Sequence, residues 1–282
     1  MANMNFVFID AFDINDAWYQ CVKRCVEVGH EYLITRGSYA GQKRKEFDFV
    51  SGVIRKPSNR PLNIIIPEGS SLPAPNDSPY IETYFAEYLG SDTKKPQEDY
   101  TYGERLNNPR IRGIDEILAK DVAELGISQE KEASFKEKLK EITLGISPIQ
   151  EVVKMYVNQG FGTNQATLEI AMPSDILLKD PPCLRLIDTR IRYGKLHFAV
   201  YFRSWDLVGG FPSNLGGIQL LKEMMVQDIN AGLEAAGKEE RIEDGEIIFS
   251  SKGLHIYEHQ WEYANLRLGR GEKKDERKTD QP

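Results

Sequence analysis

The hydrophobic pattern changes from helical spacing in the first part of the chain to strand-like alternation in the second. Apolar residues from Ile14 to Gly29 lie largely along one stripe, which predicts an amphipathic helix with Asp13 or Asn15 as its cap and Gly29 as its end. The same spacing predicts further helices at Tyr80–Leu89, Gly113–Leu125, Ile149–Val157 and about Leu215–Asn230.

Strands are predicted where apolar positions alternate or form short runs. They are expected at Phe47–Val53, Ile64–Ile66, Thr167–Met172, Leu184–Ile191 and Lys195–Phe202, the last two joined by a Tyr193-Gly194 turn. Ile247–Phe249 and Leu254–Tyr257 are typical of short strands or strand-to-helix junctions. Because helices and strands follow one another without strict β-α-β alternation, we expect an α+β fold organised around one mixed sheet.

Composition narrows the classes of function. The 282 residues carry 36 basic and 43 acidic side chains, a formal charge of −7, which argues against broad binding to nucleic acid. An apolar content of 40% fills a sizeable core, so we expect one domain over residues 1–268 and a polar, mobile tail at 269–282. No stretch approaches the ~20 apolar residues of a membrane span, and the N-terminus lacks a signal pattern. We therefore expect a cytoplasmic protein without a membrane partner.

The cysteines provide the first candidate chemistry. Cys21, Cys25 and Cys183 form neither a disulfide framework nor a zinc site with CxxC spacing, so no metal is predicted. Cys183 follows two prolines and opens a strand, which would hold its thiol in a fixed place. A nucleophilic thiol also needs a nearby positive charge, and a hairpin would fold Arg203 back beside it. The alternative for Cys183 is an inert thiol, and the alternative for Arg203 is a surface salt bridge.

Polar residues after the second strand of this hairpin suggest a ligand site. Arg203 and Ser204 are suited to a phosphate, and the glycines that follow them allow a flat ligand close to the backbone. Asn214 is either the cap of the next helix or an amide that pairs with the O4 and N3–H of a uracil. His255 and Tyr257 alternate on a predicted strand, so both point to one face.

The order of these motifs resembles the thymidylate synthase family. The resemblance is carried by Pro182-Cys183, then Arg203-Ser204 with Asp206, Gly210 with Pro212 and Asn214, and His255 with Tyr257. Upstream, Arg36-Gly37-Ser38 is similar to the family's N-terminal arginine loop, and Tyr102-Gly103 to its Tyr-Gly motif. The resemblance spans about residues 14–265 and looks closer to the shorter archaeal-type members than to the common bacterial form.

This resemblance implies a fold and a reaction. The fold would be a mixed sheet packed with helices, dimerising through the sheet. The reaction would transfer a one-carbon unit from methylenetetrahydrofolate, the co-substrate, to C5 of the pyrimidine nucleotide dUMP, giving dTMP. Cys183 would attack C6, and covalent attack makes C5 a nucleophile. Arg203 would contact both the thiolate and the nucleotide phosphate.

The remaining roles are likewise implied by the resemblance. Ser204 and Arg36 would complete the phosphate clamp, and Asn214 would recognise the uracil edge. His255 and Tyr257 would bind the sugar hydroxyl. Asp206 and Gly210 would border the folate and the base, and Tyr102 would belong to a proton relay.

The sequence also departs from the family pattern. Family members offer two adjacent arginines from the partner subunit, where this chain has residues 163–166, which carry no cation. The family's catalytic glutamate has no clean counterpart; Glu82 and Glu87 are candidates, and each is equally explained as a solvated helix residue. Two alternatives follow: a pyrimidine-nucleotide hydroxymethylase on the same scaffold, in which water ends the reaction, or a catalytically lapsed nucleotide-binding protein.

Overall fold

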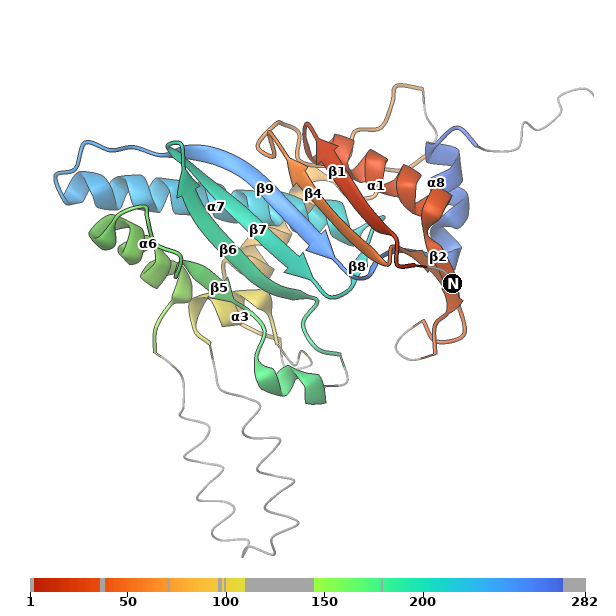
Figure 1. The fold of residues 1–282 in the computed structure, drawn as a ribbon, viewed down its shortest axis with the longest axis horizontal. Helices are drawn as coiled ribbons and strands as arrows, with labels where there is room; N and C mark the ends of the chain where they lie inside the picture. Colours follow the sequence, from red (N-terminus) through yellow and green to blue (C-terminus); the bar gives the residue numbers. More distant parts are fainter. Residues whose placement is uncertain are drawn as a thin grey trace, which may run out of the picture.

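A six-stranded mixed sheet forms the centre of the molecule (Figure 1). The structure is a computed structural model that describes residues 3–35, 39–69, 72–95, 98, 100–109, 145–178 and 180–270. The strands, in spatial order, are β1 (Phe6–Ala11), β4 (Phe49–Ile54), β9 (Glu243–Ser251), β7 (Lys195–Phe202), β6 (Leu184–Arg192) and β5 (Thr167–Glu169). Two of the pairs, β1 with β4 and β7 with β9, are parallel, and the others are antiparallel. The predicted α+β fold around a mixed sheet is confirmed.

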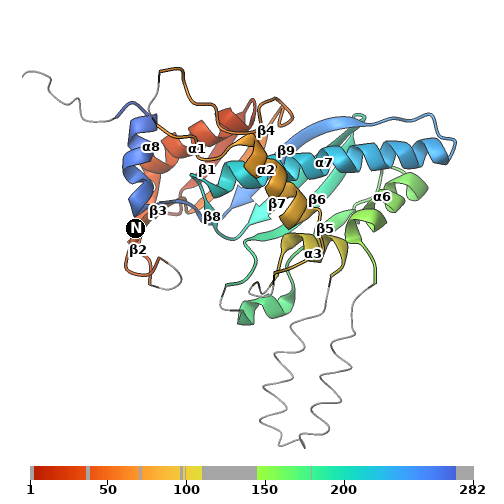
Figure 2. The same ribbon diagram turned by 180° about the vertical axis from the view of Figure 1, so that it is seen from behind.

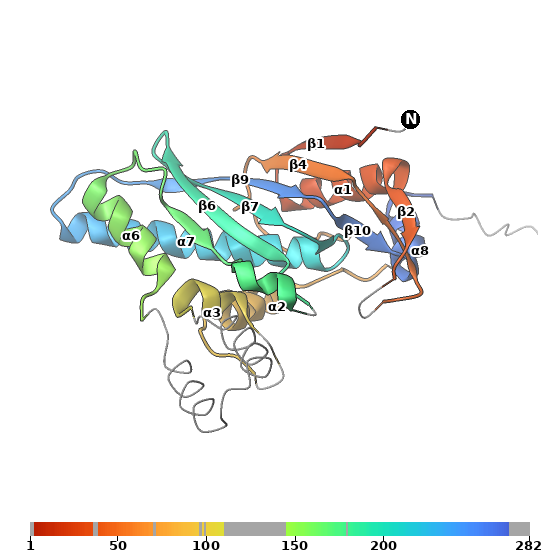
Figure 3. The ribbon, with the colours of Figure 1, turned by 60° about the horizontal axis from the view of Figure 1, so that its bottom comes forward.

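The main helices pack against one face of this sheet. They are α1 (Ile14–Val28), α2 (Ser78–Tyr84) with the π-helical turn η1 (Phe85–Leu89), α3 (Tyr102–Asn107), α6 (Pro148–Gln159) and α7 (Gly210–Ala235). Seen from behind, α7 and α2 cover the strands (Figure 2). A glycine in α7 makes the close packing of α2 on α7 possible, because a Cβ at Gly217 would lie 2.6 Å from the Tyr84 ring. Of the described helices, α1, α6 and α7 lie below the sheet in Figure 3, and none covers the opposite face.

A second, four-stranded sheet lies at one end of the first. Its order is β2 (His30–Leu33), β3 (Lys43–Glu46), β10 (Leu254–Tyr257) and β8 (Trp205–Asp206). The parallel pairing of β10 with β8 places His255 directly beside Asp206. The helix α8 (Trp261–Arg267) follows β10 through a 3-10 turn, η3 (Glu258–Gln260). Segments 49 residues apart in the sequence therefore meet where the two sheets adjoin.

Several local predictions agree with the structure. The first helix begins after Asp13, whose carboxylate accepts a hydrogen bond from the Asp16 amide at 2.9 Å, and ends before Gly29. The hairpin β6–β7 turns at Tyr193 and Gly194, both with positive φ, as a two-residue turn requires. Strand β10 has the predicted bounds.

Three predicted elements need correction. Ile64–Ile66 is not a strand, because its backbone amides donate to side chains: Ile64 to Asn76 and Ile65 to Asn15. The strand predicted from Thr167 ends at Glu169, where the amides of residues 170 and 171 both donate to the Arg185 carbonyl before the 3-10 turn η2 (Pro173–Leu177). The helix predicted from about residue 215 begins at residue 210. Strand β1 was not predicted.

Two predictions fall outside the described residues: the helix at 113–125, and the tail from residue 271 onward. In the described part of the chain, no helix has both the length and the apolar character needed to cross a membrane.

Candidate active site

Cys183 lies at the start of β6, half-buried, where the chain enters the sheet from the two prolines. The Cys183 carbonyl accepts a hydrogen bond from the Arg203 amide at 2.9 Å, across the hairpin. The next amide, that of Leu184, donates to the Tyr102 hydroxyl at 3.2 Å. The structure thus brings Cys183, Arg203 and Tyr102 together, three residues that the sequence analysis singled out.

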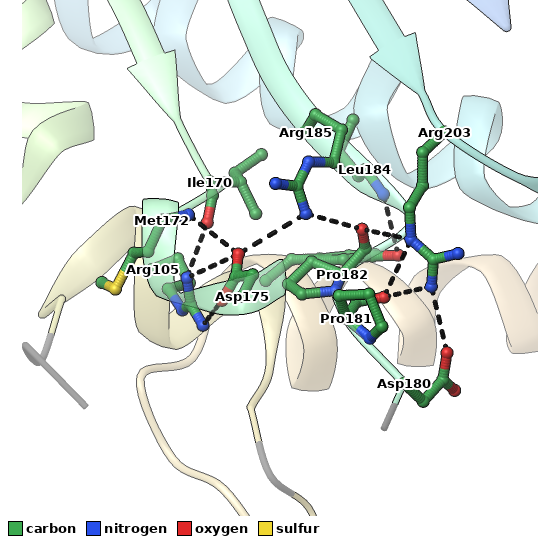
Figure 4. Close-up of polar contacts among 11 residues, drawn as sticks. Arg105, Ile170, Met172, Asp175, Asp180, Pro181, Pro182, Leu184, Arg185 and Arg203 are labelled. Carbon is green, nitrogen blue, oxygen red and sulfur yellow. Dashed lines mark hydrogen bonds and ion pairs between the residues drawn. The ribbon is translucent and has the colours of Figure 1, made fainter. Parts of the chain in front are cut away.

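The Arg203 guanidinium binds the segment that precedes Cys183 (Figure 4). Its Nε donates to the carbonyls of Pro181 and Pro182, at 3.2 Å each, and one terminal nitrogen pairs with Asp180 at 3.0 Å. The same nitrogen also donates to the Pro181 carbonyl. A hairpin partner therefore fixes the course of the chain into the cysteine, as the two-strand prediction implies.

The surroundings of the thiol favour its protonated form. Burial is the largest influence and raises the pKa of Cys183, and the carboxylate of Asp180 adds to this. The positive charges of Arg203 and Arg185 act in the opposite direction. Arg203 lowers the pKa of Cys183, as expected, but burial raises this pKa by more.

A buried ion pair anchors the segment leading to the cysteine. Asp175 in η2 and Arg105 in α3 are 2% and 3% exposed and lie 2.8 Å apart between carboxylate and guanidinium. The same carboxylate accepts from the Met172 amide at 2.8 Å and faces Arg185 at 3.5 Å (Figure 4). Sequence reasoning missed this pair, because the partners are 70 residues apart and neither has a distinctive motif.

The loop after β7 is built around Asp206. Its carboxylate accepts from the backbone amides of Val208, Gly209 and Gly210, at 3.1 to 3.2 Å, and from the Gln260 side chain at 3.1 Å. These four bonds use the acceptor positions of a carboxylate. They also explain why α7 begins earlier than predicted: the carboxylate satisfies the amide of Gly210, the first residue of the helix, and the amides of the two residues before it.

Asn214 lies inside α7 rather than at its cap. The helix begins at Gly210 after Gly209, so the interpretation of Asn214 as an N-cap is wrong. Its side-chain Oδ1 accepts from the Trp205 indole at 2.8 Å. Its side chain also donates to the Tyr84 hydroxyl, which leaves one lone pair of Oδ1 and one amide hydrogen for a ligand.

His255 presents an unused acceptor. Its Nδ1 is 2.7 Å from the Gly253 carbonyl, which only accepts, so the proton is on Nδ1 and Nε2 is an acceptor. The ring is 1% exposed, and Nε2 has no hydrogen-bond partner among the described residues. Burial, the largest influence, lowers the pKa of His255 to about 4, so the ring is neutral at pH 7. The Tyr257 ring lies 4.5 Å away, between centroids, as expected for two residues on one face.

Tyr84 is a residue of this site that sequence reasoning missed. Its hydroxyl is buried and faces the Asn214 side chain. Burial raises the pKa of Tyr84 well above its usual value, nearby Tyr102 and Cys183 raise it further, and the Asn214 side chain lowers it. Tyr84 therefore lies among the candidate residues. The π-helical turn η1 follows it, and such turns often mark functional sites. This signal is visible in the structure but not in the sequence.

The two candidate glutamates lie at the surface. Glu82 is exposed beside a surface hollow that Arg60 and Leu220 also border. Glu87 is exposed and pairs with Lys95 at 3.5 Å. Neither glutamate lies near Cys183, whereas Tyr84 does.

The remaining candidates have mixed positions. Gly210 begins α7, and Ser204 follows Arg203 in the loop, half-buried. Arg36 lies outside the described residues. A hollow of about 590 Å³ opens beside Arg203 and is also bordered by Arg185 and Lys252. Across the ranges that the structure describes, no group of three or more His, Cys, Asp or Glu is placed to hold a metal ion.

Comparison with solved structures identifies the class of fold. The thermostable thymidylate synthase A from Bacillus subtilis is similar, with a TM-score of 0.56 over 92% of this chain and 85% of that chain. The identity is 14%, so this match shows the fold alone.

The sequence comparisons agree with the match to this fold. Residues 145–278 match the family model described as thymidylate synthase. The putative thymidylate synthase of Methanosarcina acetivorans is 26% identical over 258 residues, covering 90% of this chain and 91% of that protein. The one from Methanothermobacter thermautotrophicus is 25% identical over 267 residues, covering 91% and 96%. These findings support the thymidylate synthase family and confirm the resemblance predicted from the order of motifs.

Proposed function

We propose that this chain transfers a one-carbon unit from methylenetetrahydrofolate to C5 of dUMP, giving dTMP, through a covalent adduct of Cys183. The observation that carries the proposal is the placement of Cys183 between Arg203 and Tyr102, in a chain similar to this family. The Cys183 thiolate adds to C6, and the electron pair of the C5–C6 double bond moves to C5 and O4. C5 then takes up the one-carbon unit and loses its proton. That unit is reduced to a methyl group with the hydride that the folate would supply, and the C5–C6 double bond re-forms as the thiolate leaves C6.

Because burial favours the thiol, the proton of Cys183 must leave before the attack. Arg203 supports this step by its positive charge, which stabilises the thiolate. Tyr102 lies at the amide that follows the cysteine and is a candidate member of the proton relay. Arg203 and Ser204, with Arg36, would hold the phosphate.

The unused groups of the site match a pyrimidine nucleoside. Asn214 offers a donor and an acceptor to O4 and N3–H of uracil. The unpartnered Nε2 of His255 accepts a hydrogen bond, which a sugar hydroxyl donates, with Tyr257 beside it. A buried acceptor without a donor is costly, so the sugar would complete the site.

The start of α7 would border the folate. When bound, methylenetetrahydrofolate supplies the one-carbon unit and the reducing equivalents that make it a methyl group. A Cβ at Gly210 would lie 3.8 Å from the Asn214 Oδ1, so glycine keeps the surface next to the base free of a side chain. Asp206 borders this surface and shapes it by holding the amides of Gly209 and Gly210.

We further propose that residues 1–268 act as one catalytic unit and that the chain forms a homodimer through the open sheet face. Phe6 and Phe8 of β1 are each 61% exposed there, and Ile248 of β9 is 44% exposed. Phe8 lies opposite Ser51 and Ile248 opposite Val53, so the register places them on the same face. Large apolar residues grouped on one face are typical of an interface.

One observation favours a second function, a lapsed nucleotide-binding protein. Neither Glu82 nor Glu87 lies at the site, where the resemblance calls for a glutamate. The test is release of tritium from C5 of labelled dUMP with methylenetetrahydrofolate, with the product identified by mass. Tritium release with a dTMP mass supports the proposal, and a hydroxymethyl product identifies the hydroxymethylase. Binding of dUMP without tritium release, and without trapping by 5-fluoro-dUMP, identifies the lapsed protein.

A further inference from the structure

We propose that Trp205 is a positioning residue that fixes the amide of Asn214 and thereby selects 4-oxo over 4-amino pyrimidines. This inference rests on the proposed function, because it concerns the base that the same site binds. The contact is the hydrogen bond from the Trp205 Nε1–H to Asn214 Oδ1, 2.8 Å long. An indole N–H only donates, so the Asn214 atom that faces it must be the oxygen.

Aromatic packing prevents the indole from turning away. Trp205 is 2% exposed and stacks on Phe202, with 3.7 Å between ring centroids and an angle of 8°. The Phe211 ring is tilted against the indole, with 4.6 Å between ring centroids, and Phe249 packs edge-to-face with it at 6.4 Å. If the Asn214 amide flipped, its NH₂ would face the buried N–H, leaving two donors without an acceptor.

The fixed orientation has a consequence for the ligand. The Asn214 Oδ1 keeps one lone pair. Its Nδ2 donates one hydrogen to the Tyr84 hydroxyl and keeps the other, so the amide offers an acceptor and a donor. Uracil presents N3–H and O4, which match this pair. Cytosine presents a bare N3 and a 4-amino group, which match only the flipped amide. Trp205 thus opposes the one rearrangement that would let Asn214 accept cytosine.

The experiment compares dUMP with dCMP in two variants. Trp205→Phe keeps a ring but removes the N–H. The matched control is Trp18→Phe, because the Trp18 indole is also buried and donates to the carbonyls of Leu207 and Val208, at 3.0 and 3.2 Å, in the same loop. The readout is the ratio of dissociation constants for the two nucleotides by titration calorimetry, supported by the ratio of C5 tritium release.

We expect the preference for dUMP to fall about tenfold or more in Trp205→Phe and to stay unchanged in Trp18→Phe. A purely structural role would weaken both nucleotides together and leave the ratio unchanged. If Trp205→Phe does not fold, benzothienylalanine at position 205 keeps the shape and replaces the N–H by sulfur, and the same fall is expected. If the wild type prefers dUMP and Trp205→Phe has the same ratio, the inference about Trp205 is wrong and the proposed function still stands. A wild type that binds neither nucleotide overturns the proposed function as well.

Discussion

On the Cys183 side of the candidate site the chain is held by charged groups, whereas on the Asn214 side it is held by neutral hydrogen bonds and stacked rings. Arg203, Asp180 and the Arg105–Asp175 pair fix the course of the chain into the cysteine. On the other side, Trp205 and Asn214 are joined by one hydrogen bond between uncharged partners.

The difference corresponds to two chemical tasks. Proton loss and attack by a thiolate depend on local charge, so charged groups near Cys183 can tune the reaction. Recognition of a base depends on the direction of donors and acceptors, so rigid neutral groups near Asn214 can give specificity. Substitutions on the first side should alter reactivity and pH dependence, and substitutions on the second side should alter the choice of base.

The largest effect is expected from removal of the nucleophile. Cys183→Ala should lower turnover at least about a thousandfold and leave dUMP binding largely intact, because the groups assigned to the base and sugar are unchanged. Tritium release and titration calorimetry measure the two properties. Cys21→Ala is the control, since that thiol is also buried but lies in α1. Turnover that survives in Cys183→Ala would contradict the covalent mechanism.

The second effect concerns the buried ion pair. Asp175→Asn leaves the guanidinium of Arg105 buried without its charge partner, and breaking such a pair costs about 3–5 kcal/mol of unfolding free energy. Urea denaturation measures the loss. The control is Glu151→Gln, whose partner Lys154 is exposed, so the loss should be about 1 kcal/mol or less. Equal losses in the two variants would show that Asp175 does not anchor the segment before the cysteine.

A smaller effect is expected at the open sheet face, which neither side of the site uses. Phe8→Asp introduces a charge into the proposed apolar interface and should raise the dimer dissociation constant about tenfold or more. Sedimentation equilibrium measures this constant. Tyr193→Asp is the control, because Tyr193 is 95% exposed in the β6–β7 turn, away from that face. A wild-type chain that is a stable, active monomer at assay concentration would refute the homodimer itself.

The two sides of the site also differ in how far the sequence predicts them. The contact of Arg203 with the Cys183 segment follows from a local hairpin, in which the turn and the alternation together set the register. The bond from Trp205 to Asn214 could not be predicted, because it depends on where α7 begins, and Asp206 decides this through its contacts with backbone amides.

The same reasoning explains the errors at longer range. Helical spacing in the segment 80–89 did not show that Tyr84 faces the site and that Glu82 and Glu87 face solvent, because the contacts that bury Tyr84 come from distant parts of the chain such as α7. The apolar run Ile64–Ile66 has the composition of a strand, but the amides of Asn15 and Asn76 satisfy its backbone from distant parts of the chain. Tertiary contacts decided both cases.

The smallest predicted effect tests how charge tunes the thiol. Because burial raises the pKa of Cys183 above its ordinary value of 9.0, the thiolate fraction should increase continuously from pH 7 to pH 9, and alkylation by iodoacetamide should increase with it. The Asp180 carboxylate contributes to this rise, so Asp180→Asn should lower the pKa of Cys183 and increase the rate at pH 7.5. We expect about a two- to threefold increase, because Asp180 is 86% exposed and its charge is screened by water and salt.

Asp188→Asn is the control, since Asp188 is an exposed carboxylate of β6 that bonds to Thr167. Mass spectrometry of the alkylated peptide separates Cys183 from Cys21 and Cys25, whose burial raises their pKa values. A rate that is unchanged in Asp180→Asn, or raised equally in Asp188→Asn, would show that the Arg203–Asp180 pair does not set the reactivity of the thiol.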